Sequence, residues 1–109
     1  MSYNVKTLRV FEKQAKRLVK KYASLQLELR ELISSLKMNP IQGTPLGNNC
    51  YKIRLAIASK GKGKSGGARI ITHVAIRKQI VYLVSIYDKS EVSTVTLKEI
   101  YNLLAEIGV

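Results

Sequence analysis

Hydrophobic and polar positions alternate along residues 50–58 with the two-residue period of a β-strand. The odd-numbered positions from 51 to 57 are apolar and fall on one face, whereas Lys52 and Arg54 fall on the other. Residues 68–76 alternate in the same way, and residues 80–87 are apolar on both faces, as in a strand buried inside a sheet. A shorter, mixed segment at residues 3–8 indicates an edge strand. The pattern therefore predicts four strands.

Three other segments repeat apolar residues every three or four positions, which is the period of a helix face. The first helix is predicted from Phe11, Ala15, Leu18 and Tyr22, and the second from Leu25, Leu29, Leu32 and Leu36. We expect Ser24 to cap the second helix and Pro40 to follow its end. Thr96 and Glu99 have the spacing of a capping box, which opens a C-terminal helix.

The predicted order is β-α-α-β-β-β-α in one domain over residues 1–109. We expect an α+β fold, with an N-terminal αα-hairpin and the C-terminal helix packed on an antiparallel sheet. The strand at residues 80–87 is expected to be the central one. Residues 40–49 and 88–93 are predicted to be loops because of their polar, glycine and proline content.

The charge balance adds a partner class to this picture. The chain has 19 Lys and Arg against 7 Asp and Glu, a net charge of +12 and a pI near 10.0. Such an excess favours nucleic acid as a partner, although solubility alone is the alternative. The single cysteine, Cys50, excludes an internal disulfide. With no membrane-span pattern and no signal peptide, we expect a cytoplasmic protein without membrane partners.

The cations are concentrated where two strands meet. Lys52 and Arg54 are separated by about 7 Å on one strand face, and Arg69 opens the next strand. Between them, a glycine-rich loop carries Lys60, Lys62 and Lys64. A lysine crowded by other cations can act as a base, and an arginine can clamp phosphate oxygens, so the cluster suits phosphodiester chemistry on RNA. A solvated cationic face, or a docking surface for an acidic partner, remains the alternative.

Other chemistries fit the sequence poorly. Residues 61–65 resemble a phosphate-binding P-loop, but Ala58 stands where that motif needs glycine and a strand follows. One histidine and one cysteine cannot close a metal site, and we expect neither metal nor cofactor. His73 shares the face of Arg69 by parity, where a structural role is favoured over proton transfer. Cys50 is expected to be packed rather than nucleophilic.

Three segments together resemble the RelE/ParE superfamily of bacterial type II toxin–antitoxin toxins. They are L-G-N-N-C-Y-K-I-R-L at residues 46–55, G-G-A-R-I-I at 66–71 and V-Y-L-V-S-I-Y-D-K-S-E at 81–91. The basic glycine loop is similar to the RelE-type, HigB-like branch, whose members cleave messenger RNA in the ribosomal A site. The resemblance covers nearly the whole chain and implies the same β-α-α-β-β-β-α order.

The resemblance also implies roles for single residues. Lys52 matches a catalytic lysine, Arg54 a second catalytic basic position, and Arg69 the arginine that holds the scissile phosphate. Lys89 falls near a further basic position. The chain departs from the best-known member in having no tyrosine at residues 90–96, with Tyr87 close but out of register. Its loop at residues 59–67 is longer, and Lys60, Lys62 and Lys64 could give an additional grip on RNA.

The resemblance therefore implies a metal-independent, ribosome-dependent endoribonuclease that inhibits translation by cutting mRNA and is silenced by a cognate antitoxin. A ParE-like inhibitor of DNA gyrase shares the fold but generally lacks the basic trio on these strands. A degenerate member that only binds nucleic acid or an antitoxin is the third reading.

Overall fold

The computed structural model describes residues 2–61, 63, 65–92 and 94–108. Its elements, in chain order, are β1 (Asn4–Thr7), α1 (Arg9–Lys21), α2 (Leu25–Met38), β2 (Thr44–Gly47), β3 (Cys50–Leu55), the 3₁₀ turn η1 (Ala58–Lys60), β4 (Ala68–Ala75), β5 (Ile80–Asp88), α3 (Leu97–Leu104) and the 3₁₀ turn η2 (Ala105–Ile107). All the predicted helices and strands are present, in the predicted order. The strand predicted at residues 50–58 ends earlier, because the chain turns into η1.

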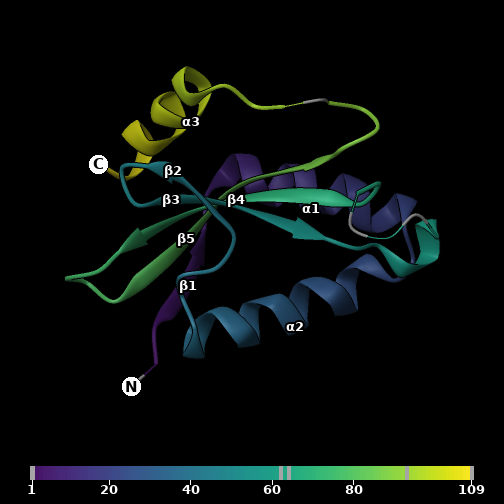
Figure 1. Ribbon diagram of the computed structural model, residues 1–109, viewed down its shortest axis with the longest axis horizontal. Coiled ribbons are helices and arrows are strands. Elements are labelled where there is room, and N and C mark those ends of the chain that lie inside the picture. Colours follow the sequence, from purple (N-terminus) through teal and green to yellow (C-terminus); the bar gives the residue numbers. More distant parts are fainter. Residues whose placement is uncertain (1, 62, 64, 93, 109) are drawn as a thin grey trace.

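The strands form a single sheet in the order β1-β5-β4-β3-β2 (Figure 1). Neighbouring strands from β5 to β2 are antiparallel, but β1 runs parallel to β5. The α+β class is confirmed, and the expectation of a wholly antiparallel sheet is wrong for this pair. A parallel neighbour requires a long crossover connection, which the intervening helices and strands provide. The central strand is β4, with β5 beside it.

Residues 44–47 form a strand that the sequence analysis placed in a loop. Gly47 pairs with Cys50, so Asn48 and Asn49 alone make the turn between β2 and β3. Both asparagines have positive φ angles, 53° and 59°, as the two-residue turn of a β-hairpin requires. Asparagine tolerates this conformation better than most residues, so the Asn-Asn pair could have been used to predict a hairpin turn from the sequence.

Helices cover both faces of the sheet (Figure 1). On one face, α1 and α2 pack on the strands through the larger core, which includes Phe11, Leu18, Leu25, Leu36, Ile70 and Leu83. On the other face, a smaller core joins α3 to the sheet through Cys50, Ile71, Val84, Tyr87, Ile100 and Leu104. Because α3 is short, we infer that part of this face of the sheet is left uncovered.

The two predicted caps have different outcomes. The Thr96 hydroxyl accepts a hydrogen bond from the Glu99 amide at 3.2 Å, which confirms the cap of α3. Ser24 precedes α2 but makes no capping hydrogen bond to that helix. Its hydroxyl instead accepts from the Ser59 amide at 2.9 Å, so Ser24 ties η1 to the start of α2.

Candidate functional site

The site begins with two arginines that face each other across β3 and β4. Arg54 is the direct ladder partner of Arg69, and Lys52 lies two residues before Arg54 on the same strand. Directly opposite side chains have Cβ atoms roughly 4.5–5.5 Å apart. The alternation of a strand puts Lys52 on the same sheet face as these arginines, which confirms that the structure brings the three predicted residues together.

The two arginines differ in exposure. Arg54 is exposed, whereas Arg69 is only 5% exposed. The Arg69 guanidinium donates to the Ala68 carbonyl at 3.2 Å and to the Ser65 carbonyl at 3.3 Å. These contacts fix the side chain against the end of the β3–β4 loop. Arg69 is therefore held in place before any ligand binds, while Arg54 remains free to adjust.

A glycine lets the loop return close enough for this arrangement. A Cβ atom on Gly67 would lie 2.1 Å from the Leu55 carbonyl oxygen, which no side chain can occupy. Gly67 therefore brings the chain back against the end of β3, two residues before Arg69. This close approach sets the register in which Arg69 meets Arg54.

Lys52 and Arg54 also line a surface hollow of about 530 Å³ at the β3 edge, together with Gln42, Gly43, Thr44 and Ile53. No ion pair joins either cation to a carboxylate within the described part of the chain. Like charges placed opposite each other on a sheet destabilise it unless something neutralises them. The hollow and its cations are thus suited to a bound anion.

Tyr87 completes a row across three strands, because it pairs with Arg69 as Arg69 pairs with Arg54. Burial raises the pKa of its hydroxyl, and hydrogen bonds with Thr94 and Val95 partly offset this effect. The tyrosine is only 5% exposed. Sequence reasoning set Tyr87 aside as out of register, and only the ladder revealed its position.

Lys89 follows β5 directly and is exposed. Its amide donates to the Gly67 carbonyl at 3.1 Å, which extends the contact between β4 and β5 by one step. The backbone of Lys89 is therefore close to the Arg69 end of β4, as its predicted role requires.

Lys60, one of the three loop cations expected to grip RNA, is held in an ion pair inside the protein. Its ammonium group lies 2.5 Å from the Asp88 carboxylate, and its side chain is only 9% exposed. Asp88, placed in a polar loop by composition, is instead fully buried at the end of β5 and supplies the acceptor. The other two loop cations, Lys62 and Lys64, lie outside the described residues.

His73 lies farther along the same face, under α3. It is 4% exposed and contacts Cys50, with 3.6 Å between the sulfur and Nδ1. Burial lowers the pKa of His73 and raises the pKa of the Cys50 thiol to about 11. A neutral imidazole beside a protonated thiol fits packing, as the sequence analysis favoured for both residues.

Neither a metal centre nor a membrane span is evident in the described residues. No group of three or more His, Cys, Asp or Glu side chains there could hold a metal ion. None of the helices in this part of the chain has the length and apolar character to cross a membrane.

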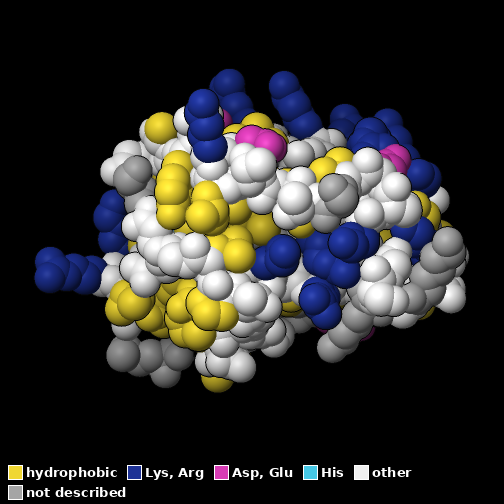
Figure 2. Space-filling model, turned by 45° about the horizontal axis from the view of Figure 1, so that its top comes forward, with side chains coloured by type: hydrophobic (Ala, Val, Ile, Leu, Met, Phe, Trp, Pro, Cys, Tyr) yellow, Lys and Arg dark blue, Asp and Glu magenta, His cyan; other side chains and the backbone are white. Residues whose placement is uncertain are grey.

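Figure 2 shows one face of the molecule, on which Lys and Arg side chains gather near the middle and again along the upper border. Few Asp or Glu side chains appear on this view. The large excess of positive charge is therefore displayed on the surface as groups rather than as evenly mixed charges.

Comparisons with known proteins agree with this fold. Residues 8–107 match the family model described as the RelE toxin of the RelE/RelB toxin–antitoxin system. A free, doubly mutated form of the E. coli toxin RelE has a TM-score of 0.66 and 19% identity, with 100% of each chain covered.

Two further solved structures are similar. The intact E. coli RelBE toxin–antitoxin complex matches with a TM-score of 0.61 and 19% identity over 79% of this chain and 95% of that one. The isolated E. coli RelE toxin matches with a TM-score of 0.56 and 18% identity over 98% and 99%. These likenesses establish the fold, and the family model covers most of the chain. The chain belongs to the RelE family of toxins from toxin–antitoxin systems.

Proposed function

We propose that this protein is a ribosome-dependent endoribonuclease of the RelE-type, HigB-like branch, which cuts mRNA in the ribosomal A site. The observation that carries the proposal is the Arg54–Arg69 cross-strand pair, with Lys52 beside it on the same face. This arrangement brings together two guanidinium groups and an ammonium group. Among the described residues, no carboxylate forms an ion pair with Lys52 or Arg54, so the three cations favour a phosphate between them.

The chemistry needs no metal, because RNA carries its own nucleophile. A base removes the proton of the 2′-hydroxyl, whose oxygen attacks the neighbouring phosphorus. The bond from phosphorus to the 5′-oxygen then breaks, and the departing oxygen takes a proton from water, which leaves a 2′,3′-cyclic phosphate and a 5′-hydroxyl. Charge builds up on the phosphate oxygens along the way, and fixed cations are most effective at that point.

We assign these tasks to Lys52, Arg54, Arg69 and Lys89, which we call the cationic face. Lys52, which lies beside Arg54 on the same face of the sheet, is the base. Arg69, fixed by the carbonyl groups of Ser65 and Ala68, clamps the phosphate in the transition state. Arg54 and Lys89 supply further positive charge. Tyr87 is not assigned as the acid, because it is only 5% exposed in the folded protein.

The proposed physiological partner is a cognate antitoxin. The E. coli RelBE complex, whose toxin is similar in fold, contains an antitoxin bound to its toxin. A strongly cationic surface is also well suited to a segment that is disordered alone and folds on binding. Co-expression with the antitoxin is expected to abolish toxicity.

The direct test is a purified translation reaction with the toxin, followed by primer extension on the message. We expect cuts inside codons positioned in the A site, and little cutting of the same RNA without ribosomes. Intact message together with arrested supercoiling by DNA gyrase would instead support a ParE-like inhibitor. Binding to ribosomes without cutting or gyrase inhibition would leave a degenerate, binding-only toxin.

A further inference from the structure

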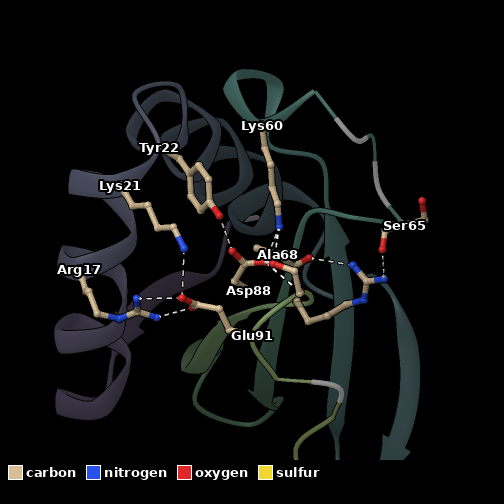
Figure 3. Close-up of polar contacts among 10 residues, drawn as sticks. Arg17, Lys21, Tyr22, Lys60, Ser65, Ala68, Asp88 and Glu91 are labelled. Atoms are coloured by element: carbon tan, nitrogen blue, oxygen red, sulfur yellow. Dashed lines mark hydrogen bonds and ion pairs between the residues drawn. The ribbon is translucent and has the colours of Figure 1, made fainter.

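The carboxylate of Asp88, at the end of β5, is buried and accepts four hydrogen bonds. None of the donors is a residue of the cationic face. Asp88 has no exposed surface. It accepts from the Lys60 ammonium group at 2.5 Å, the Tyr22 hydroxyl at 2.5 Å, and the Ser90 amide and hydroxyl at 2.9 and 2.8 Å (Figure 3). We refer to Tyr22, Lys60, Asp88 and Ser90 as the Asp88 cluster.

The Asp88 cluster joins three parts of the fold that are distant in sequence. Tyr22 follows α1, Lys60 ends η1 at the root of the β3–β4 loop, and Ser90 begins the segment after β5. Burial alone would raise the pKa of Asp88, but the donors from Lys60, Tyr22 and Ser90 outweigh it and hold that pKa well below its ordinary value. The carboxylate is therefore charged at neutral pH, and a buried charge fixes its donors firmly.

The opposite end of the same loop holds the catalytic arginine. The Ser65 carbonyl accepts from Arg69, while Gly67 accepts from the amide of Lys89. Asp88 is itself the ladder partner of Ala68, the residue before Arg69. One end of the loop thus depends on Asp88 through Lys60, and the other end orients Arg69 and Lys89.

We propose that Asp88 is a positioning residue for cleavage, which holds the β3–β4 loop and the start of the next segment so that Arg69 and Lys89 face the phosphate. This inference rests on the proposed nuclease function. Its physical basis is that a fixed donor gains most of its catalytic effect from being aligned before the reaction. If the Lys60–Asp88 ion pair is lost, the loop no longer holds Ser65 in place. The Arg69 guanidinium, which donates to the Ser65 carbonyl, then loses its alignment.

Loss of the Asp88 charge should shift the loop without unfolding the protein. The first residues of η1 are anchored separately, because the Ala58 amide donates to Glu28 at 2.8 Å and the Ser59 amide to Ser24 at 2.9 Å. These contacts do not involve Asp88. The substitution Asp88→Asn keeps the shape of the side chain and removes its charge.

Glu91 supplies a matched control in the same segment. It accepts from Arg17 at 2.6 Å and from Lys21 at 3.1 Å at the surface, and neither partner belongs to the β3–β4 loop (Figure 3). Glu91→Gln and Asp88→Asn change the net charge equally. Any difference between them is therefore independent of general attraction to the ribosome.

The experiment measures single-turnover cleavage of mRNA across a range of ribosome concentrations. We expect Asp88→Asn to lower the saturated rate by about tenfold to a hundredfold while the half-saturating concentration stays within about threefold. Glu91→Gln should match the wild type in both. Lys60→Met should resemble Asp88→Asn, and the Asp88→Asn/Lys60→Met double variant should be no slower than the worse single variant, because both act through one contact.

Amide hydrogen exchange provides a readout that does not depend on activity. The amides of Lys60 and Ser90 should exchange faster in Asp88→Asn, while amides in β4 and β5 remain as protected as in the wild type. If Asp88→Asn does not fold, Tyr22→Phe removes a single hydrogen bond to the same carboxylate and should give a smaller loss of rate in the same direction.

The outcomes separate the two proposals. A wild-type protein that leaves messages intact on ribosomes overturns the nuclease function and, with it, the positioning role. A wild type that cuts, beside an Asp88→Asn variant that cuts as fast as Glu91→Gln, overturns the positioning role alone.

Discussion

Arg69 and Arg54 are the same residue type in one ladder pair, yet their surroundings give them different properties. Arg69 is nearly buried and bonded to two carbonyl groups, whereas Arg54 is exposed at a sheet edge. A fixed guanidinium can stabilise a transition state, while a mobile one contributes mainly attraction. The environment of each side chain therefore decides which substitutions should affect the rate.

Arg69→Ala should lower the saturated cleavage rate at least a hundredfold, or by about 3 kcal/mol of barrier, since it removes the phosphate clamp. Lys52→Ala should behave similarly. Lys13→Ala, which removes one charge from the exposed face of α1, is the matched control and should cut normally. Because Arg69 is buried, circular dichroism must first show that the variant is folded. Equal rates for Arg69→Ala and Lys13→Ala would defeat the site assignment.

Tyr87→Phe should keep the saturated cleavage rate within about threefold of the wild type, well short of the 10²–10⁴ effect of a general acid. The physical reason is that Tyr87 is only 5% exposed in the folded protein. The pH–rate profile should also be unchanged. A large loss of rate, together with loss of the basic limb of that profile, would show that Tyr87 turns toward the substrate and acts as the acid.

The depressed pKa of Asp88 predicts how stability changes with pH. Its ionised form is favoured in the folded state, so its contribution is complete above about pH 4, the ordinary pKa of the side chain. The contribution is lost as pH falls toward the lower folded value. The gap in Tm between wild type and Asp88→Asn should therefore be constant near neutrality and narrow below pH 4. Glu91→Gln should show little gap at any pH, and a constant gap for Asp88→Asn down to pH 2 would contradict the prediction.

At the scale of elements, four of the five strands described were predicted, but their pairing was not. Alternation placed Lys52 and Arg54 on one face and gave β3 and β4 to within a few residues, and an apolar run gave β5. The register that sets Arg54 against Arg69 and Tyr87 depends on how the long β3–β4 loop closes, which periodicity does not encode. Lys60 was misread for the same reason, because its acceptor Asp88 lies two strands later in the chain.

The cap of α3 gives a prediction at this scale. Thr96→Ala should lower the free energy of unfolding by about 1 kcal/mol, since the Glu99 amide loses its acceptor. Thr96→Ser keeps the hydroxyl and should recover most of the loss in urea unfolding. Ser34→Ala, at an exposed position inside α2, is the control and should not destabilise the protein. Equal destabilisation by Thr96→Ala and Thr96→Ser would mean that the hydroxyl does not cap the helix.

At the scale of the whole molecule, the net charge of +12 favours a polyanionic partner, and the arrangement of the charge should decide how the proposed RNA substrate binds. The cationic face lies at one end of β4, where Arg69 is found. Lys78 lies in the turn at the other end of the same strand and, like Arg54, is exposed to solvent. The two ends therefore allow local contact to be separated from overall charge.

Ribosome affinity should fall steeply with salt, with a linear relation between the logarithms of affinity and salt concentration. Arg54→Ala should reduce that slope by about one, because it removes one phosphate contact. Lys78→Ala removes the same charge outside the contact and should leave the slope unchanged. Binding measured by co-sedimentation at several salt concentrations distinguishes them, and identical slopes for the two variants would place Arg54 outside the RNA interface.

The parallel pairing of β1 with β5 has a consequence for the synthesis of the protein. β1 leaves the ribosome well before its partner strand, which follows only after both long helices and three other strands. At about 5–20 residues per second, the early strand waits several seconds for its neighbour. The same late strand carries Tyr87 and Asp88, so the cross-strand row of Arg54, Arg69 and Tyr87 is incomplete until it emerges. The proposed active site is therefore unassembled for most of the time that the chain is growing.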